Sequence, residues 1–420
     1  MAPNPPQPYR RRLADAPLAH LIATFPAVLV NGPRATGKTT TAGRVAKTVV
    51  RLDRPAQAAA FRADPDAALR IQDTPVLLDE WQEVPEVLGA VKRAVDADSI
   101  PGRYILTGSV NAEMEQAMWP GTGRLIRLEM YGFTELEVRD AVDPQRSPFL
   151  DRMALADPAV LTLPPDSLDL PGYIDLALRG GFPDLVLGTL SQTDRQNWLD
   201  SYMEQLLNRD LLSTGGNRDP GKMRAYFRAL ALSTAGIPQE KTLADAAKID
   251  ARTARAYDEL FTRLFIADKI PGWGENRLHR AVSAPKRYIV DPALSARSAR
   301  LTTAGILTDG DQIGRILDTF AMAQLRPEVA LSDGRQTAHH IRTKQGEQEV
   351  DLVVELDDNR VLALEFKASA APTAGDAKHL VWLRERVGKR FVAGAVMHTG
   401  PAVFSLGDRI LAVPFRAIWG

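Results

Sequence analysis

One motif near the N-terminus limits most strongly what this chain can fold into. Residues 27–31, Ala-Val-Leu-Val-Asn, form a short apolar run typical of a buried strand. The run leads directly into Gly-Pro-Arg-Ala-Thr-Gly-Lys-Thr at residues 32–39, which fits the pattern G-x-x-x-x-G-K-[ST] without a mismatch. A strand, a glycine loop and a helix in this order predict an α/β domain whose loop surrounds phosphate groups.

The residues of this loop have separate roles in such a motif. We expect the backbone N–H groups to point at the phosphates, Lys38 to reach the β and γ phosphates, and Thr39 to bind Mg²⁺. The sequence therefore predicts ATP and Mg²⁺ as ligands. The nucleotide-binding residues that it predicts are Gly32, Pro33, Arg34, Ala35, Thr36, Gly37, Lys38, Thr39 and Thr40.

Further segments supply the groups that hydrolysis requires. An apolar run ends in Asp79 and Glu80, and we expect Asp79 to hold Mg²⁺ and Glu80 to act as general base toward the attacking water. Thr107 or Ser109, after the next apolar run, is suited to sense the γ phosphate or to orient the water; turn capping is the alternative. Arg124, in a glycine-containing turn, is a candidate arginine finger for its own or a neighbouring subunit, and a surface arginine is the alternative.

Composition narrows the class of protein. The chain has 420 residues, 45% of them hydrophobic, which suggests about three domains. Cysteine is absent, which excludes disulfides, Fe–S clusters and thiol nucleophiles. No stretch approaches the ~20 apolar residues needed to cross a bilayer, so we expect a soluble, cytoplasmic protein without a membrane partner.

The formal net charge of zero conceals two opposed segments. Residues 151–220 carry 11 acidic and 5 basic side chains, whereas residues 221–300 carry 15 basic and 8 acidic ones. A basic segment is a candidate for binding phosphate backbones, and a solvated helical surface is the alternative.

The basic segment has the pattern of helices followed by a hairpin. A short helix is predicted near 243–248 and a longer one over 253–265, with apolar residues at 3.6-residue spacing in the second. Two short strands follow, which together suggest a winged helix-turn-helix. A packing module without DNA contact is the alternative. The candidate contacts to double-stranded DNA are Arg252 and Arg255 at the start of the second helix and Lys286 and Arg287 on the wing.

Two carboxylates are predicted to face each other near the C-terminus. Two apolar strands flank the tight-turn sequence Asp-Asp-Asn, and pairing Leu356 with Arg360 across it brings Asp351 opposite Glu365. Lys367 lies two residues beyond Glu365 and therefore on the same face. Such acids suit a second Mg²⁺ or Mn²⁺ that lowers the pKa of a bound water, while Lys367 orients that water. An inert fold, in which the lysine neutralises the acids, is the alternative.

Taken together, these motifs resemble a group of prokaryotic AAA+ ATPases whose second half is a largely uncharacterised helical and nuclease-like region. The resemblance also implies a winged helix, together with nucleotide and Mg²⁺ roles for Lys38, Thr39, Asp79 and Glu80 and a sensor role for Thr107 or Ser109. Trp81 stands where the family usually has an aliphatic residue. The segments that carry the resemblance are 32–40, 52–53, 64–65, 78–85, 105–109, 123–124, 179–183 and 208–211.

The C-terminal strands resemble the PD-(D/E)XK nuclease fold. In that resemblance Asp351, Glu365 and Lys367 match the motif, and Asp318 is an acid on an upstream helix. The proline of the motif is replaced by Val350, and Asp318 stands where the family more often has glutamate. A shorter acid at that position changes the geometry available to a metal ion.

We therefore predict an α/β chain of four segments that hydrolyses ATP and acts on DNA through its second half. The alternative is a nucleotide-dependent switch that binds DNA or a protein partner and carries an inert nuclease-like domain. Either protein is compatible with an oligomer. The predicted segments are a P-loop AAA+ ATPase domain (1–140), a helical lid and connector (141–220), a winged helix-turn-helix (221–300) and a restriction-endonuclease-like α/β domain (301–420).

Overall fold

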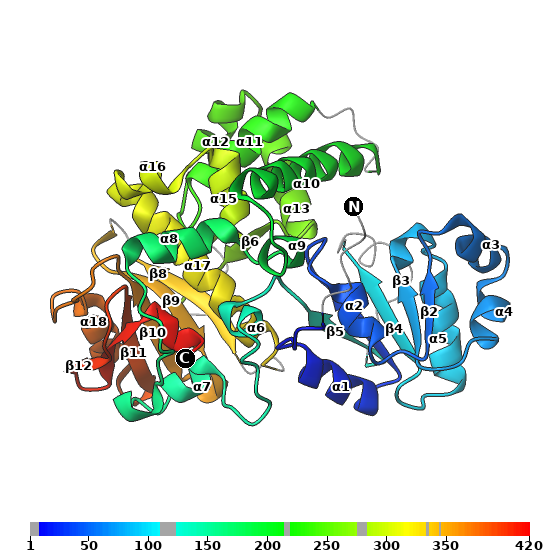
Figure 1. The fold of residues 1–420 in the computed structure, drawn as a ribbon, viewed down its shortest axis with the longest axis horizontal. Helices are drawn as coiled ribbons and strands as arrows, with labels where there is room; N and C mark the ends of the chain where they lie inside the picture. Colours follow the sequence, from blue (N-terminus) through cyan, green and yellow to red (C-terminus); the bar gives the residue numbers. More distant parts are fainter. Residues whose placement is uncertain (1–7, 110–122, 214–218, 275–283, 333–335, 344–345) are drawn as a thin grey trace. The chain divides into compact units, whose positions relative to one another are not determined.

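Figure 1 shows the fold in a computed structural model, which describes residues 8–109, 123–213, 219–274, 284–332, 336–343 and 346–420. The side chains of residues 208–213 lie outside the described part, and they include the segment 208–211 that contributed to the resemblance to AAA+ ATPases. The chain divides into two compact units. The first comprises the residues up to Phe133 with Arg263–Phe265, and the second comprises Thr134–Thr262 and Ile266–Gly420. The change of unit at Phe133 lies close to the predicted boundary at residue 140.

The first unit is built on a parallel sheet in the order β2-β3-β4-β1-β5. The three central strands are buried along their whole length, as parallel strands covered by helices must be. The strands are β1 (Ala27–Asn31), β2 (Thr48–Arg51), β3 (Val76–Asp79), β4 (Tyr104–Gly108) and β5 (Leu125–Glu129). The helices are α1 (Asp15–Thr24), α2 (Lys38–Gly43), α3 (Pro55–Ala63), α4 (Pro65–Arg70) and α5 (Val87–Ala97).

The second unit begins with helices. Three of them start at an aspartate whose side chain accepts backbone N–H groups of the first turn, namely Asp169, Asp219 and Asp250. No helix in the described part of the chain is long and apolar enough to span a membrane. The helices in order are α6 (Glu135–Val138), α7 (Phe149–Met153), α8 (Leu170–Arg179), α9 (Pro183–Val186), α10 (Gln192–Ser213), α11 (Pro220–Leu232), α12 (Glu240–Ala247) and α13 (Ala251–Arg263).

An antiparallel hairpin, β6 (Ala267–Ile270) and β7 (Lys286–Ile289), follows these helices. Three more helices come next: α15 (Pro292–Ala299), α16 (Thr303–Leu307) and α17 (Gly310–Ala330). The unit ends in a mixed sheet of order β12-β13-β11-β10-β9-β8 (Figure 1). Its elements are β8 (Thr337–Arg342), β9 (Glu349–Glu355), β10 (Val361–Phe366), α18 (Lys378–Val387), β11 (Phe391–His398), β12 (Phe404–Gly407) and β13 (Ile410–Pro414).

Helices cover both faces of this mixed sheet. Phe320 of α17 shares a hydrophobic cluster with Leu364 of β10. Leu380 of α18 belongs to a second cluster with Ala363, the neighbour of Leu364. Because successive strand residues point to opposite faces, α17 and α18 pack on opposite sides of the sheet.

The register of β9 and β10 agrees with the sequence prediction. Glu355 lies opposite Val361, and the Leu356 N–H donates to the Arg360 carbonyl at 2.8 Å. The turn between them has positive φ at Asp358 and Asn359, which these residue types tolerate best after glycine. Continued along the strands, this register brings Asp351 level with Glu365.

One hydrophobic cluster joins the segments that were predicted as separate domains. It contains Phe149 and Tyr173 from 141–220, Tyr288 from 221–300, and Phe320 and Leu364 from 301–420. All five side chains are buried. The three segments therefore share a core within the second unit.

Candidate functional site

The loop between β1 and α2 has a backbone that requires glycine where the motif has it. Gly32 has φ 141°, and a Cβ at this position would lie 2.0 Å from the Met130 carbonyl oxygen. Gly37, at the other end of the loop, has φ 91°. Both values lie in the region that other residues rarely adopt. The nine predicted nucleotide-binding residues, 32–40, form this loop and the first turn of α2.

Lys38 is buried and folds back over the loop. Its Nζ donates to the Gly32 carbonyl at 3.0 Å and to the Pro33 carbonyl at 2.5 Å. Burial lowers the pKa of Lys38 to about 8, with partial compensation by Glu80. Its partners are thus neutral carbonyl groups, which an anion can replace.

Asp79 lies at the end of β3, level with Thr107 in β4. Its Oδ1 accepts a hydrogen bond from the Thr39 hydroxyl at 2.7 Å and from the Thr107 hydroxyl at 2.6 Å. Carboxylate and hydroxyl oxygens are the ligands that Mg²⁺ prefers. The structure therefore brings three of the predicted residues together in an arrangement that fits Mg²⁺.

Glu80 and Ser109 have different partners from Thr107. Glu80 takes a left-handed conformation with φ 55°, and Gln82 Nε2 donates to its carboxylate. A non-glycine residue in this region costs of the order of 1–2 kcal/mol, so the surrounding structure must hold it there. Ser109 accepts from Arg34 Nε at 3.1 Å and is therefore tied to the loop.

Sequence reasoning missed Arg12, which supports the loop. Its guanidinium donates to the Thr36 carbonyl and to the Tyr131 carbonyl, both at 2.8 Å. The side chain is buried although it belongs to a run of three arginines. Nothing in that run distinguishes the buried arginine from its neighbours, so only the tertiary contacts could identify it.

Arg124 does not reach the loop of its own chain. It precedes Leu125, which pairs with Ala27 at the start of β1, whereas the loop follows the end of β1. Four strand residues separate these levels, or about 13 Å. Arg124 instead pairs with Asp96 at 2.9 Å. Arg124 therefore lies where the parallel strands begin, whereas the loop lies where β1 ends, so a finger role within its own subunit is wrong. A role in a neighbouring subunit stays a prediction.

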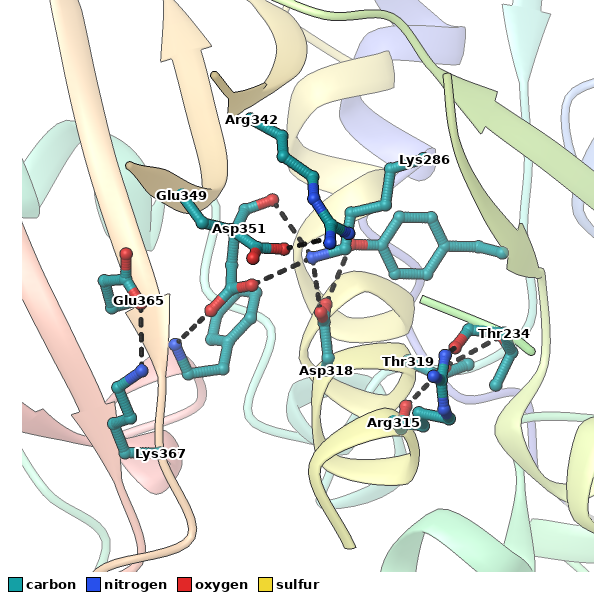
Figure 2. A network of polar contacts seen from close by, with 12 residues as sticks. Thr234, Lys286, Arg315, Asp318, Thr319, Arg342, Glu349, Asp351, Glu365 and Lys367 are labelled. Carbon is teal, nitrogen blue, oxygen red and sulfur yellow. Dashed lines mark hydrogen bonds and ion pairs between the residues drawn. The ribbon is translucent and has the colours of Figure 1, made fainter. Parts of the chain in front are cut away.

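A second cluster of charged side chains lies in the second unit (Figure 2). Asp318, Asp351, Glu365 and Lys367 all line one pocket of about 490 Å³. Lys367 Nζ donates to Glu365 Oε2 at 3.1 Å. The structure thus brings together the four residues that the nuclease resemblance selected.

Lys286, which was predicted to contact DNA, belongs to this cluster. Its Nζ lies 2.5 Å from Asp318 Oδ2 and 3.0 Å from Asp351 Oδ1 (Figure 2). The Tyr288 hydroxyl donates to Asp318 Oδ1 at 2.8 Å, and the Phe366 N–H donates to Asp351 Oδ2 at 3.0 Å. All four oxygens of the two aspartates therefore have partners.

Burial and charge together set the protonation of this cluster. Burial raises the pKa of Asp318 to about 7 and, with the charge of Asp351, raises the pKa of Glu365 well above its usual range. Burial also opposes ionisation of Asp351, but Lys286 and the Phe366 N–H outweigh it and lower the pKa. For Lys286, burial is likewise outweighed, and the two aspartates raise its pKa.

These acids do not fit a second metal ion. Among the described residues, no group of three or more histidine, aspartate or glutamate side chains is arranged to hold one. The ammonium of Lys286 lies between Asp318 and Asp351, where a cation would have to bind. The predicted Mg²⁺ or Mn²⁺ at Asp351 and Glu365 therefore disagrees with this geometry.

The proposed wing contacts are also wrong. Lys286 is 3% exposed and Arg287 is 5% exposed. Arg287 Nη1 lies 2.9 Å from Asp258 Oδ1, so both cations are paired inside the unit and neither can meet a duplex. Arg252 and Arg255 at the start of α13 are exposed, as expected. Strand alternation, which sends neighbouring side chains to opposite sides, was the available signal for the different environments of Lys286 and Arg287.

Three protein-family models match successive parts of the chain. Residues 24–138 match an AAA domain, residues 170–304 match a domain of unknown function (DUF8612), and residues 313–418 match another (DUF4143). The first unit carries an AAA-type P-loop ATPase domain. The AAA match begins before β1 and ends after β5, so it contains every residue assigned above to nucleotide binding.

Two curated relatives match nearly the whole chain. The uncharacterized proteins Mb2031c of Mycobacterium bovis and Rv2008c of Mycobacterium tuberculosis are each 27% identical over 409 residues, which is 96% of this chain and 83% of theirs. Among solved structures, the Walker-type ATPase PABY2304 of Pyrococcus abyssi matches with a TM-score of 0.42 and 15% identity over 70% of this chain and 99% of that one. That similarity is too low to support an argument.

Proposed function

We propose that the chain hydrolyses ATP, with Mg²⁺, at the loop formed by residues 32–40. The observation that carries this proposal is the contact of Asp79 with the hydroxyls of Thr39 and Thr107 at 2.7 and 2.6 Å, next to a loop shaped for phosphate. Thr39 and Asp79 would hold the metal. Bound Mg²⁺ offsets the charge of the phosphates and orients them.

The chain's own residues supply the remaining steps. Lys38 exchanges its two carbonyl partners for phosphate oxygens, which keeps its ammonium satisfied. Glu80 accepts the proton of the attacking water, and Gln82 orients the Glu80 carboxylate by the hydrogen bond that it donates. Thr107 keeps Asp79 directed at Thr39. This division makes Glu80 the residue whose charge matters for turnover and not for binding.

Replacement of Glu80 by Gln tests the proposal. We expect Glu80→Gln to lower phosphate release at least about 100-fold, because the general base is lost, while ATP affinity changes little. Glu83→Gln, an exposed neighbour on the same short segment, is the matched control and should turn over ATP like the parent. Equal phosphate release from all three proteins would contradict the assignment.

For the second unit we propose an inert nuclease-like pocket. The position of Lys286 between Asp318 and Asp351 supports this, because the acids are already neutralised by a side chain. Plasmid DNA incubated with Mg²⁺ or Mn²⁺ should stay intact with the parent and with Asp351→Ala alike. Cleavage by the parent that disappears in Asp351→Ala would overturn the proposal.

We propose that the helical part of the second unit binds duplex DNA under control of the nucleotide. Arg252 and Arg255 support this because both are exposed at the start of α13, where a recognition helix meets a duplex. Arg252→Ala/Arg255→Ala should weaken binding and reduce the slope of log K against log salt by about 2, whereas Arg300→Ala should not. A slope near zero for the parent would exclude DNA and leave a protein partner.

A further inference from the structure

The nuclease-like pocket contains a cation that belongs to the chain itself. The Lys286 side chain is 4% exposed, and it comes from the hairpin strand β7, whereas its partners come from α17 and β9. The ammonium contacts both carboxylates directly, at 2.5 and 3.0 Å. Figure 2 shows the ammonium between the two acids. A divalent cation at this position would need the same oxygens.

Glu365 is a third acid of the pocket, and its carboxylate is not bonded to the Lys286 ammonium. Its Oε1 is buried and, among the described residues, has no hydrogen-bond partner, whereas Oε2 accepts from Lys367. A buried polar atom without a partner normally costs about 1–3 kcal/mol. Glu365 lines the same pocket as Asp351, so the pocket offers a carboxylate that Lys286 does not use.

The same strand connects the pocket to the helical module. Lys286 and Arg287 are consecutive in β7, so their side chains leave the strand on opposite sides. Lys286 reaches the acids of the pocket, while Arg287 reaches Asp258 of α13 at 2.9 Å. Both pairs are buried, so β7 is bonded to the acids of the pocket on one side and to Asp258 of α13 on the other.

We infer that Lys286 is a tethered replacement for a divalent cation, which excludes metal from the pocket lined by Asp318, Asp351 and Glu365. This inference rests on the proposed inert pocket. It adds the residue that makes the pocket inert and the ligand, a divalent cation, that would enter if that residue were withdrawn.

Metal binding to the full chain without nucleotide tests the inference independently of any activity. Free Mn²⁺ is measured by electron paramagnetic resonance for the parent, for Lys286→Met, and for Lys269→Met as the matched control. Lys269 lies in the same hairpin and also pairs with a buried aspartate, Asp258, at 2.6 Å. We expect Lys286→Met to bind one more equivalent of Mn²⁺ than the parent and Lys269→Met. The dissociation constant of this extra site should be at least about tenfold lower than that of any Mn²⁺ binding at the same pocket in those two proteins.

Further variants test whether the extra Mn²⁺ is bound by the acids of the pocket. Asp351→Asn added to Lys286→Met should remove the extra equivalent, and its persistence would place the metal elsewhere and overturn the inference. If Lys286→Met does not fold, Lys286→Gln, whose neutral amide can still donate a hydrogen bond to a carboxylate, keeps all three acids and decides the question. A folded variant lacking Lys286 that binds no more Mn²⁺ than the parent overturns the inference.

The parent distinguishes this inference from the proposed functions. An Mn²⁺ equivalent bound by the parent and lost in Asp351→Asn overturns both the tethered cation and the inert pocket. Phosphate release bears on neither, because it reports the first unit. Loss of ATP turnover would therefore not contradict the inference about Lys286. Mn²⁺ bound in the pocket of the parent would not contradict the ATPase proposal.

Discussion

The two units each combine an aspartate at a sheet with a buried lysine, but they pair them differently. In the first unit, Asp79 accepts from two neutral hydroxyls while Lys38 donates to neutral carbonyls. In the second unit, Lys286 donates directly to Asp318 and Asp351. Where the two charges are kept apart, each can bind a ligand of opposite charge; where they meet, the ligand's place is taken.

The largest expected effect separates the two aspartates by activity. Asp79→Asn should reduce ATP turnover by about 100-fold or more, because it removes an ionic ligand beside Thr39. Asp351→Asn should leave turnover within about twofold of the parent, since it alters only the second unit. Phosphate release at saturating ATP measures both. A loss of turnover in Asp351→Asn equal to that in Asp79→Asn would break the comparison.

The two lysines should separate by stability. Lys286→Met leaves two buried carboxylates without their cation and should cost about 3–5 kcal/mol. Lys38→Met removes an ammonium bonded only to carbonyls and should change stability by less than about 1 kcal/mol while abolishing ATP binding. Urea unfolding, followed separately for each unit, measures this. Similar losses in both variants would show that the lysines are equivalent in the folded chain.

A smaller effect is expected from pH in the second unit. Burial, with contributions from Lys286, His339 and Arg342, lowers the pKa of His340 to about 4, and the ring bonds the Ala284 carbonyl at 3.1 Å. Because the unfolded histidine titrates near 6.5, the unfolded state binds more protons between pH 6.5 and 4. The His340 contribution is thus fully present above pH 6.5 and is lost as pH falls, by roughly 3 kcal/mol.

His340→Gln provides the measurement for this prediction. Glutamine keeps an N–H donor for the carbonyl but does not titrate, so the fall in stability between pH 6.5 and 4 should be shallower than in the parent. His20→Gln, at an exposed histidine, should leave the pH profile of stability unchanged. Parallel profiles for His340→Gln and the parent would show that His340 is not a neutral buried group.

The smallest effect is expected for Arg124. Its ion pair with Asp96 is exposed, so Arg124→Ala should cost less than about 0.5 kcal/mol. ATP turnover by dilute, monomeric chains should be unchanged, because Arg124 lies where the strands of the sheet begin and the loop lies where β1 ends. A loss of turnover that appears only at concentrations where chains associate would support a finger acting between subunits. A loss in the monomer would contradict the placement of Arg124.

Some features of both sites were predictable because they depend on short-range spacing. The loop at 32–40 and the acid at Asp79 follow from patterns of a few residues around single strands. The pairing of β9 with β10 follows from one tight turn, since a hairpin's register is set by its loop. The approach of Glu365 and Lys367 follows from the two-residue repeat of a strand.

Other features required the tertiary structure. Arg12 and Lys286 look like ordinary surface cations, and only packing against Thr36 or against Asp318 and Asp351 buries them. The sharing of one core by residues from 141 to 420 likewise depends on contacts between distant segments.

The sequence by itself determined that this chain has a phosphate-binding loop with a carboxylate beside it, and that two acids and a lysine meet on adjacent C-terminal strands. Only the tertiary structure decided that a third strand delivers Lys286 to one of these acids, Asp351, and to Asp318 of α17. The physical reason is range. Turn chemistry and strand alternation act over a few residues, whereas the compensation of a buried charge depends on which segments the fold brings within about 3 Å of each other.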